Sequence, residues 1–176
     1  MSRVLVVEYD KLPPSDNTIK EIGYFFIRGQ KKKQPVIRYS TEAENYKKEL
    51  VRWINDEYFH AVQVFARGHL PEMLYCLQIT FEFPQMDILT AGWLQVSHGE
   101  RKAKNPYKRL DVGNRRKLLE DSLSEATGID DSLFWEGDNI KLVSADGDPH
   151  VTLMLEERDP VGFGVPEPYL RGLHGR

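Results

Sequence analysis

The chain has one cysteine, Cys76, so it cannot form an internal disulfide or a zinc site built from several cysteines. It also lacks long apolar runs, because no stretch approaches the ~20 residues that a membrane helix needs. No secretory signal pattern precedes the first acidic residues, Glu8 and Asp10. These absences predict a soluble, cytoplasmic protein. Since Cys76 lies within an apolar run, we expect a buried structural thiol.

The chain also lacks an overall positive charge, with 24 Lys and Arg against 27 Asp and Glu and a formal net charge of −3. The basic residues are nevertheless concentrated in two segments. The larger segment comprises Arg101, Lys102, Lys104, Lys108, Arg109, Arg115, Arg116 and Lys117. The smaller segment comprises Arg28, Lys31, Lys32 and Lys33. Such concentrated charge favours binding to a phosphate backbone, although a charge run is also common on a solvated surface.

The length of 176 residues and the 40% of hydrophobic residues predict one domain with a substantial core. Short runs rich in β-formers and longer runs with helical spacing alternate along the chain. The expected strands cover residues 3–8, 22–27, 35–39, 73–83, 139–145 and 150–156. The expected helices begin at Thr41, ending before Gly68, and at Asn114, ending at Ala126. The pattern predicts an α+β (mixed α/β) domain in which two main helices pack on a mixed sheet of five or six strands.

Local signals add detail to this expectation. The prolines within residues 12–17 predict a loop, and Thr41-x-x-Glu44 predicts a capping box with Thr41 as the N-cap. Asp146-Gly147 between two strand patterns predicts a hairpin. Residues 85–107 are expected to form an insertion with a short helix or a hairpin. The domain then covers residues 1–157, and residues 158–176 form a tail.

Two carboxylates stand where they can carry chemistry. Asp111 precedes the second helix, and Asp138 precedes the next strand. If the helix packs on the sheet, the two side chains can meet at one sheet edge. Mg²⁺ is usually held by one or two carboxylates together with water and substrate phosphate. The alternatives are ordinary local roles, with Asp111 as a helix N-cap and Asp138 as a turn residue.

Several ordered segments resemble the RusA-like family of Holliday-junction resolvases. They are Pro13-Pro14-Ser15-x-Asn17, Tyr39-Ser40-Thr41-Glu42 leading to Tyr46, Lys108-Arg109-x-Asp111-x-Gly113-Asn114-x-x-Lys117 followed by Asp121-x-Leu123, and Phe134-Trp135-x-Gly137-Asp138. The resemblance covers nearly the whole chain up to about Glu157. It implies a homodimer that binds and cuts four-way DNA junctions with Mg²⁺ during recombination and repair. A phage or prophage origin would fit this family.

Carried over to this sequence, the resemblance implies that Asp111 and Asp138 hold the metal. Lys117 would lie near the scissile phosphate, where its charge can stabilise the transition state. Asn114, Asp121 and Asn17 would support the site. DNA contacts are expected from Arg101, Lys102, Lys104, Lys108, Arg109, Arg115, Arg116, Lys31, Lys32 and Lys33.

The chain departs from the family pattern at Gly113 and Gly137, where aspartates are expected. Glu136 is the nearest possible replacement ligand, although neighbours on a strand point to opposite faces. Other carboxylates that could contribute are Glu120, Asp121, Asp130 and Asp131. The two glycines also fit a protein of the same fold that binds branched DNA without cutting it. A third possibility is a protein-interaction module.

Overall fold

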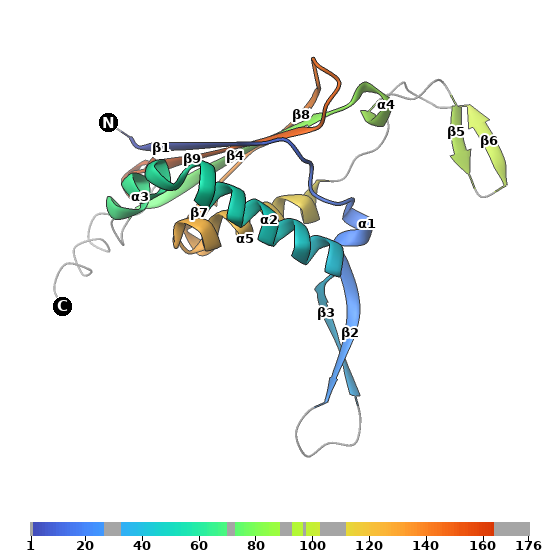
Figure 1. Ribbon diagram of the computed structural model, residues 1–176, viewed down its shortest axis with the longest axis horizontal. Coiled ribbons are helices and arrows are strands. Elements are labelled where there is room, and N and C mark those ends of the chain that lie inside the picture. Colours follow the sequence, from blue (N-terminus) through green and yellow to red (C-terminus); the bar gives the residue numbers. More distant parts are fainter. Residues whose placement is uncertain are drawn as a thin grey trace. The chain divides into compact units, whose positions relative to one another are not determined.

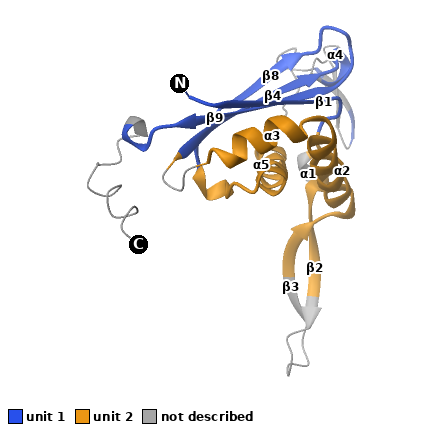
Figure 2. Ribbon diagram, turned by 60° about the vertical axis from the view of Figure 1, so that its left-hand side comes forward, with its two compact units in different colours: residues 1–12, 74–111, 134–176 blue, residues 13–73, 112–133 orange. Residues whose placement is uncertain are grey.

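The computed structural model describes residues 2–26, 33–69, 73–88, 93–96, 98–102 and 112–163. These residues form a mixed α+β structure, as predicted (Figure 1). They fall into two compact units that are described one at a time (Figure 2). Unit 1 takes its residues from Met1–Leu12, Leu74–Asp111 and Phe134–Arg176, and unit 2 from Pro13–Met73 and Val112–Leu133.

Unit 1 is built on a mixed sheet of five strands, as predicted, but the expected strands at residues 22–27 and 35–39 are not part of it. Its strands are β1 (Val4–Tyr9), β4 (Leu74–Phe83), β7 (Phe134–Glu136), β8 (Asn139–Val143) and β9 (His150–Arg158). β9 lies between β1 and β4 and is antiparallel to both. β7 and β8 pair with β4 in parallel, one after the other.

Burial alternates along the central strands of this sheet, because successive side chains point to opposite faces. In β4, Leu77, Ile79 and Phe81 have no exposed surface. Cys76 lies at an alternate position and is half-buried, so the expectation of a buried thiol is wrong. The sheet therefore has one buried face and one open face, and Cys76 lies on the open face.

The predicted hairpin around Asp146-Gly147 is wrong. β8 and β9 both pair with β4, so the central strand separates them. The connecting turn is held by Asp146 Oδ1, which accepts hydrogen bonds from Ser144 Oγ at 2.5 Å and from the Asp148 amide at 3.0 Å. Gly147 has φ +89°, a conformation that favours glycine. The residues thus predict the turn correctly, but strand pairing depends on the rest of the sheet.

The other elements of unit 1 include a short helix α4 (Gln85–Ile88) and a hairpin of β5 (Trp93–Val96) and β6 (Gly99–Lys102). These elements confirm the expected helix or hairpin in residues 85–107. β9 continues to Arg158, and a short 3₁₀ helix η2 (Pro160–Phe163) follows. The rest of the predicted tail lies outside the described residues.

Unit 2 combines helices with a separate two-stranded ribbon. Its elements are α1 (Asp16–Ile19), β2 (Lys20–Phe26), β3 (Lys33–Tyr39), α2 (Thr41–Glu57), α3 (Phe59–Arg67), α5 (Gly113–Thr127) and the 3₁₀ helix η1 (Asp131–Leu133). α1 occupies part of the segment that was expected to be a loop. α2 and α5 are the two predicted main helices, and they pack against each other.

The ends of these helices test the predicted caps. The N-cap of α2 is Ser40, whose Oγ accepts from the Ala43 amide, so the prediction of Thr41 as the cap is one residue too late. The expected single helix ending before Gly68 is divided at Tyr58 into α2 and α3. Gly128 ends α5 with φ +71°, as predicted.

Candidate functional site

The predicted site residues fall into three groups. Glu136 and Asp138 lie in unit 1, and β6 of this unit carries Arg101 and Lys102. In unit 2, α1 carries Asn17, β3 begins at Lys33, and α5 carries Asn114, Arg115, Arg116, Lys117 and Asp121. The remaining predicted residues, Asp111, Lys31, Lys32, Lys104, Lys108 and Arg109, lie outside the described residues.

Glu136 and Asp138 flank the short connection between β7 and β8. Glu136 is in register with Cys76 on β4, and Asn139 is in register with Ile79. The Ile79 amide donates to the Asp138 carbonyl oxygen at 2.9 Å, which keeps the connection close to β4. The register is the same at both pairs, so Glu136 and Asp138 lie level with Cys76 and Gln78, two open-face positions of β4. Glu136 and Asp138 are both exposed.

The electrostatics of Cys76 agree with this placement. Burial is the largest cause of its raised pKa, and the carboxylate of Glu136 is the next. Asp138 and Glu156 raise the pKa further, whereas Arg158 lowers it. Three carboxylates therefore act on one thiol from the open face of the sheet. The neutral thiol is favoured, which makes Cys76 a poor nucleophile.

The paired carboxylates fit part of a Mg²⁺ site. Two exposed carboxylates on one face match the number of protein ligands that Mg²⁺ commonly takes. Gly137 lies between them and supplies no ligand, so Glu136 stays the predicted replacement for the aspartate expected there. In the described ranges, no group of three or more His, Cys, Asp or Glu side chains is placed to hold a metal ion.

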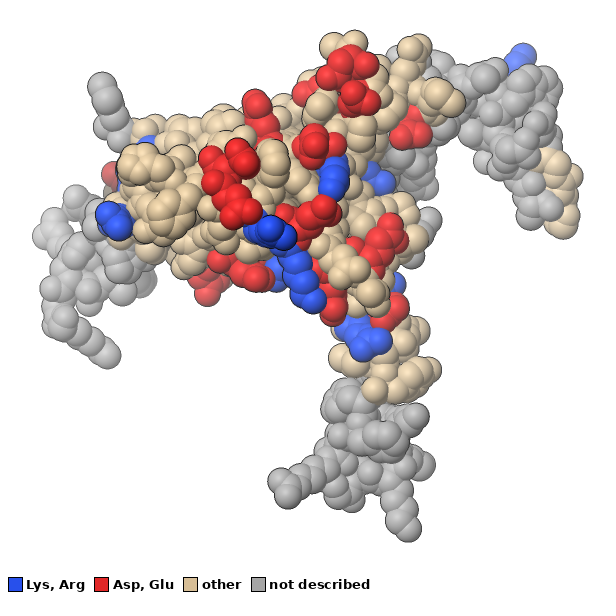
Figure 3. Space-filling view, in the orientation of Figure 1, with Lys and Arg blue, Asp and Glu red and all other residues tan. Residues whose placement is uncertain are grey.

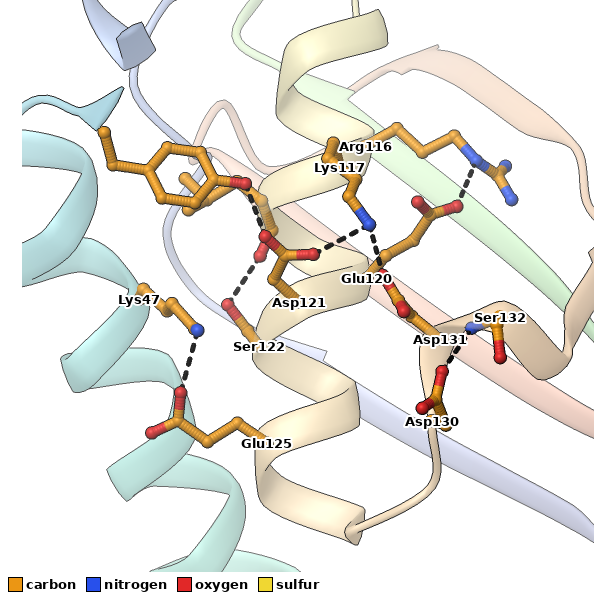
Figure 4. Close-up of polar contacts among 12 residues, drawn as sticks. Lys47, Arg116, Lys117, Glu120, Asp121, Ser122, Glu125, Asp130, Asp131 and Ser132 are labelled. Atoms are coloured by element: carbon orange, nitrogen blue, oxygen red, sulfur yellow. Dashed lines mark hydrogen bonds and ion pairs between the residues drawn. The ribbon is translucent and has the colours of Figure 1, made fainter. Parts of the chain in front are cut away.

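A second polar cluster surrounds Lys117 in unit 2 (Figure 4). The Lys117 ammonium donates to Asp131 Oδ2 and lies 2.9 Å from Asp121 Oδ1. The Tyr39 hydroxyl donates to the other oxygen, Asp121 Oδ2, at 2.6 Å. We call these four residues the Lys117 cluster. It joins β3, α5 and η1 and contains one cation and two carboxylates.

The contacts of the Lys117 cluster shift the pKa values of Lys117, Asp121 and Tyr39. The hydrogen bond to Asp131 is the main cause of a raised Lys117 pKa, although burial opposes it. Burial alone would raise the pKa of Asp121, but the hydrogen bonds from Tyr39 and Lys117 outweigh it and the pKa is lowered. Burial, then the bond to Asp121, raises the pKa of Tyr39. At neutral pH Lys117 is therefore an ammonium, Asp121 a carboxylate and Tyr39 a neutral phenol.

The other carboxylates that were considered as metal ligands have protein partners. Glu120 accepts from Arg116 Nε at 2.7 Å, and Asp130 Oδ1 accepts from the Ser132 amide at 2.8 Å. Asp121 and Asp131 belong to the Lys117 cluster. The Lys117–Asp121 pair could be read from its i, i+4 spacing. The contribution of Tyr39 was missed, because 82 residues separate it from Asp121.

No family model matches the chain, and no curated protein is significantly similar to it. The resemblance to the RusA-like family therefore stays a prediction. None of the helices in the described ranges is long and apolar enough to cross a membrane.

Proposed function

We propose that the protein is a Mg²⁺-dependent, structure-selective endonuclease that cuts Holliday junctions and other branched DNA in recombination and repair. The observation that supports this proposal best is the placement of Glu136 and Asp138 on one exposed face at the edge of β4. Oxygen ligands at a strand end, in a chain with two concentrated basic segments, suit a metal-assisted cut in DNA.

In this proposal Asp138, Glu136 and Asp111 hold the ion. An ion held by these residues would supply Lewis-acid chemistry, polarising the phosphate and activating the attacking water. Lys117 lies near the phosphate and offsets charge that develops on it, with its ammonium oriented by Asp121 and Asp131. Asn114 and Asn17 support the site. The phosphates on either side are bound by Arg101, Lys102, Lys104, Lys108, Arg109, Arg115, Arg116, Lys31, Lys32 and Lys33. Two copies acting as a homodimer suit a junction with near two-fold symmetry.

A second candidate function is binding of branched DNA without cutting. The Lys117 cluster favours it, because two carboxylates around one ammonium leave a local charge of −1 that opposes an approaching phosphate. Glycines at positions 113 and 137 remove two possible ligands in addition. A protein of this kind keeps its affinity for branched DNA in the absence of metal.

Nicking of an end-labelled synthetic four-way junction separates the two functions. The reaction is run with the wild-type protein in Mg²⁺ and in EDTA, with a linear duplex of the same sequence as the control substrate. Symmetric nicks on the junction that require Mg²⁺ support the endonuclease. Tight junction binding with no nicks in Mg²⁺ or Mn²⁺ supports the binding protein and rules out the endonuclease.

A further inference from the structure

Strands β2 and β3 form an antiparallel ribbon that extends from the helices of unit 2 (Figure 2). In the part of the chain that the structure describes, the two strands pair only with each other. The base of the ribbon is closed by the Ser40 amide, which donates to the Ile19 carbonyl oxygen at 2.8 Å. A two-stranded ribbon is marginally stable by itself in water. Its two faces differ in the contacts that they can make.

One face of the ribbon carries an internal ion pair beside the partly exposed Val36. The guanidinium of Arg38 lies 2.8 Å from the carboxylate of Glu21 on the opposite strand. The same side chain passes over Gly23, where an added Cβ would lie 2.9 Å from Arg38 Nε. Gly23 thus leaves the space in which Arg38 crosses to its partner. This face needs no further contact to satisfy its charges.

The opposite face is apolar and exposed. Ile22 and Ile37 are direct cross-strand neighbours, and they are 67% and 72% exposed. Tyr24 is two residues further along the same face and is 67% exposed. Large apolar side chains grouped on an unburied surface usually mark an interaction site. At the base of this face, an open groove is lined by Lys20, Ile37, Arg38 and Tyr39.

The charge of the ribbon sequence indicates the chemistry of its partner. Residues 20–39 contain six basic residues and one acidic residue, a net charge of +5, so the rest of the chain carries −8. Acidic side chains are spread over the described surface in the view of Figure 3. Two ribbons of +5 repel each other, which disfavours a second copy as the partner. A polyanion that also presents flat apolar surfaces fits both features of the ribbon.

We propose that the apolar face of the β2–β3 ribbon recognises the branch point of DNA. Ile22, Tyr24 and Ile37 contact the base faces that become accessible where strands exchange, while Lys20 on the same face contacts a flanking phosphate. Apolar side chains inserted at base steps and tyrosines stacked on bases are established ways of binding distorted or unpaired DNA. This inference rests on the proposed function, because it names the part of the substrate that the ribbon reads.

Side-chain contacts connect the base of the ribbon to Lys117 in the candidate site. Tyr39 is the last residue of β3, and its hydroxyl binds Asp121 on α5. The same carboxylate group contacts Lys117. Contacts at the ribbon are thus connected through two side-chain interactions to the lysine that the proposed function places near the phosphate.

The test measures binding of a fluorescent four-way junction and of a linear duplex in EDTA, so that binding does not depend on cutting. The double variant Tyr24→Ser/Ile37→Ser is compared with the wild type. We expect its junction affinity to fall about tenfold or more, because one base stack has roughly that effect, with much less change for the duplex. Val64→Ser on α3 is the matched control, since Val64 is also exposed, at 58%. Thermal melts check that each variant remains folded.

Each outcome bears on one of the two proposals. Unchanged junction affinity in a folded Tyr24→Ser/Ile37→Ser variant overturns the role of the ribbon and leaves the endonuclease proposal standing if the wild type cuts. Lost junction affinity with no cutting by the wild type supports the ribbon and rejects the endonuclease. Sedimentation of the wild type and of the double variant without DNA measures their oligomeric states. A dimer that the double variant converts to a monomer means that a second copy covers this face, which also overturns the inference.

Discussion

The hydroxyl of Tyr39, at the end of β3, donates a 2.6 Å hydrogen bond to Oδ2 of Asp121 on α5. The other oxygen of Asp121 contacts Lys117, so one carboxylate joins the base of the ribbon to the candidate catalytic lysine. The bond is charge-assisted, which makes it stronger than a bond between neutral groups. It is therefore the contact through which the two proposed functional parts of unit 2 are linked.

Removal of this bond should have a measurable effect on stability. We expect Tyr39→Phe to lower the free energy of unfolding by about 1–2 kcal/mol, because a half-buried carboxylate loses a donor. Tyr24→Phe is the control, since Tyr24 is exposed and its change should stay within about 0.5 kcal/mol. Urea unfolding monitored by circular dichroism measures both values. Equal effects of the two substitutions would show that the Tyr39 bond contributes nothing.

The lowered pKa of Asp121 predicts a pH dependence. A carboxyl group with a lower pKa in the folded state adds stability above its unfolded pKa of about 3.9, and this stability is lost as the pH falls through the folded value. The difference in unfolding free energy between wild type and Asp121→Asn should therefore be constant from about pH 8 to pH 5 and shrink below about pH 4. Urea titrations across this range test it. A difference that stays constant down to about pH 3 would show that Asp121 gains nothing from its partners in the folded state.

The sheet of unit 1 provides a paired test on neighbouring residues of β9. Glu157 is 7% exposed and accepts from Arg3 Nε at 2.7 Å, whereas Glu156 points to the other face and pairs with the exposed Arg158. We expect Glu157→Gln to lower the free energy of unfolding by about 2–3 kcal/mol, since a buried pair is broken. Glu156→Gln should lower it by less than about 1 kcal/mol. Similar losses in both variants would contradict the assigned faces of β9.

The start of α2 offers a fourth stability test. Ser40 Oγ caps the helix by accepting from the Ala43 amide at 3.2 Å. We expect Ser40→Ala to lower the free energy of unfolding by about 1 kcal/mol, and Thr41→Ala to have less effect. A larger loss for Thr41→Ala than for Ser40→Ala in thermal or urea unfolding would support Thr41 as the N-cap, as the sequence predicts.

Local patterns in the sequence predict most of the elements, because their causes are local. The apolar alternation in residues 73–83 predicts β4, and the helical spacing with Gly128 predicts α5 and its end. The pairing of β8 and β9 could not be predicted in this way. An Asp-Gly turn specifies a change of direction, but the insertion of β4 between the two strands depends on contacts with residues some 60 positions earlier.

The same division applies to the candidate site. The spacing of Lys117 and Asp121 predicts that they share a helix face. Sequence spacing cannot bring Tyr39 to Asp121, since that contact depends on how the ribbon joins the helices. The shared face of Glu136 and Asp138 follows from the register of β7 and β8 on β4. The predicted ligand Asp111 lies outside the described residues, so its place in the site stays a prediction.

The most direct test of the proposed metal site compares Asp138→Asn with Asp148→Asn in single-turnover nicking of a labelled four-way junction in Mg²⁺. Both aspartates are exposed loop residues of unit 1, but only Asp138 shares a face with Glu136. We predict that Asp138→Asn slows nicking by more than about 100-fold. Mutating a residue that only hydrogen-bonds to a metal ligand already lowers metal affinity or activity by about 10- to 100-fold, and loss of a ligand should have a larger effect. Junction affinity in EDTA should be unchanged, and Asp148→Asn should cut at the wild-type rate. Wild-type nicking by Asp138→Asn would contradict the account.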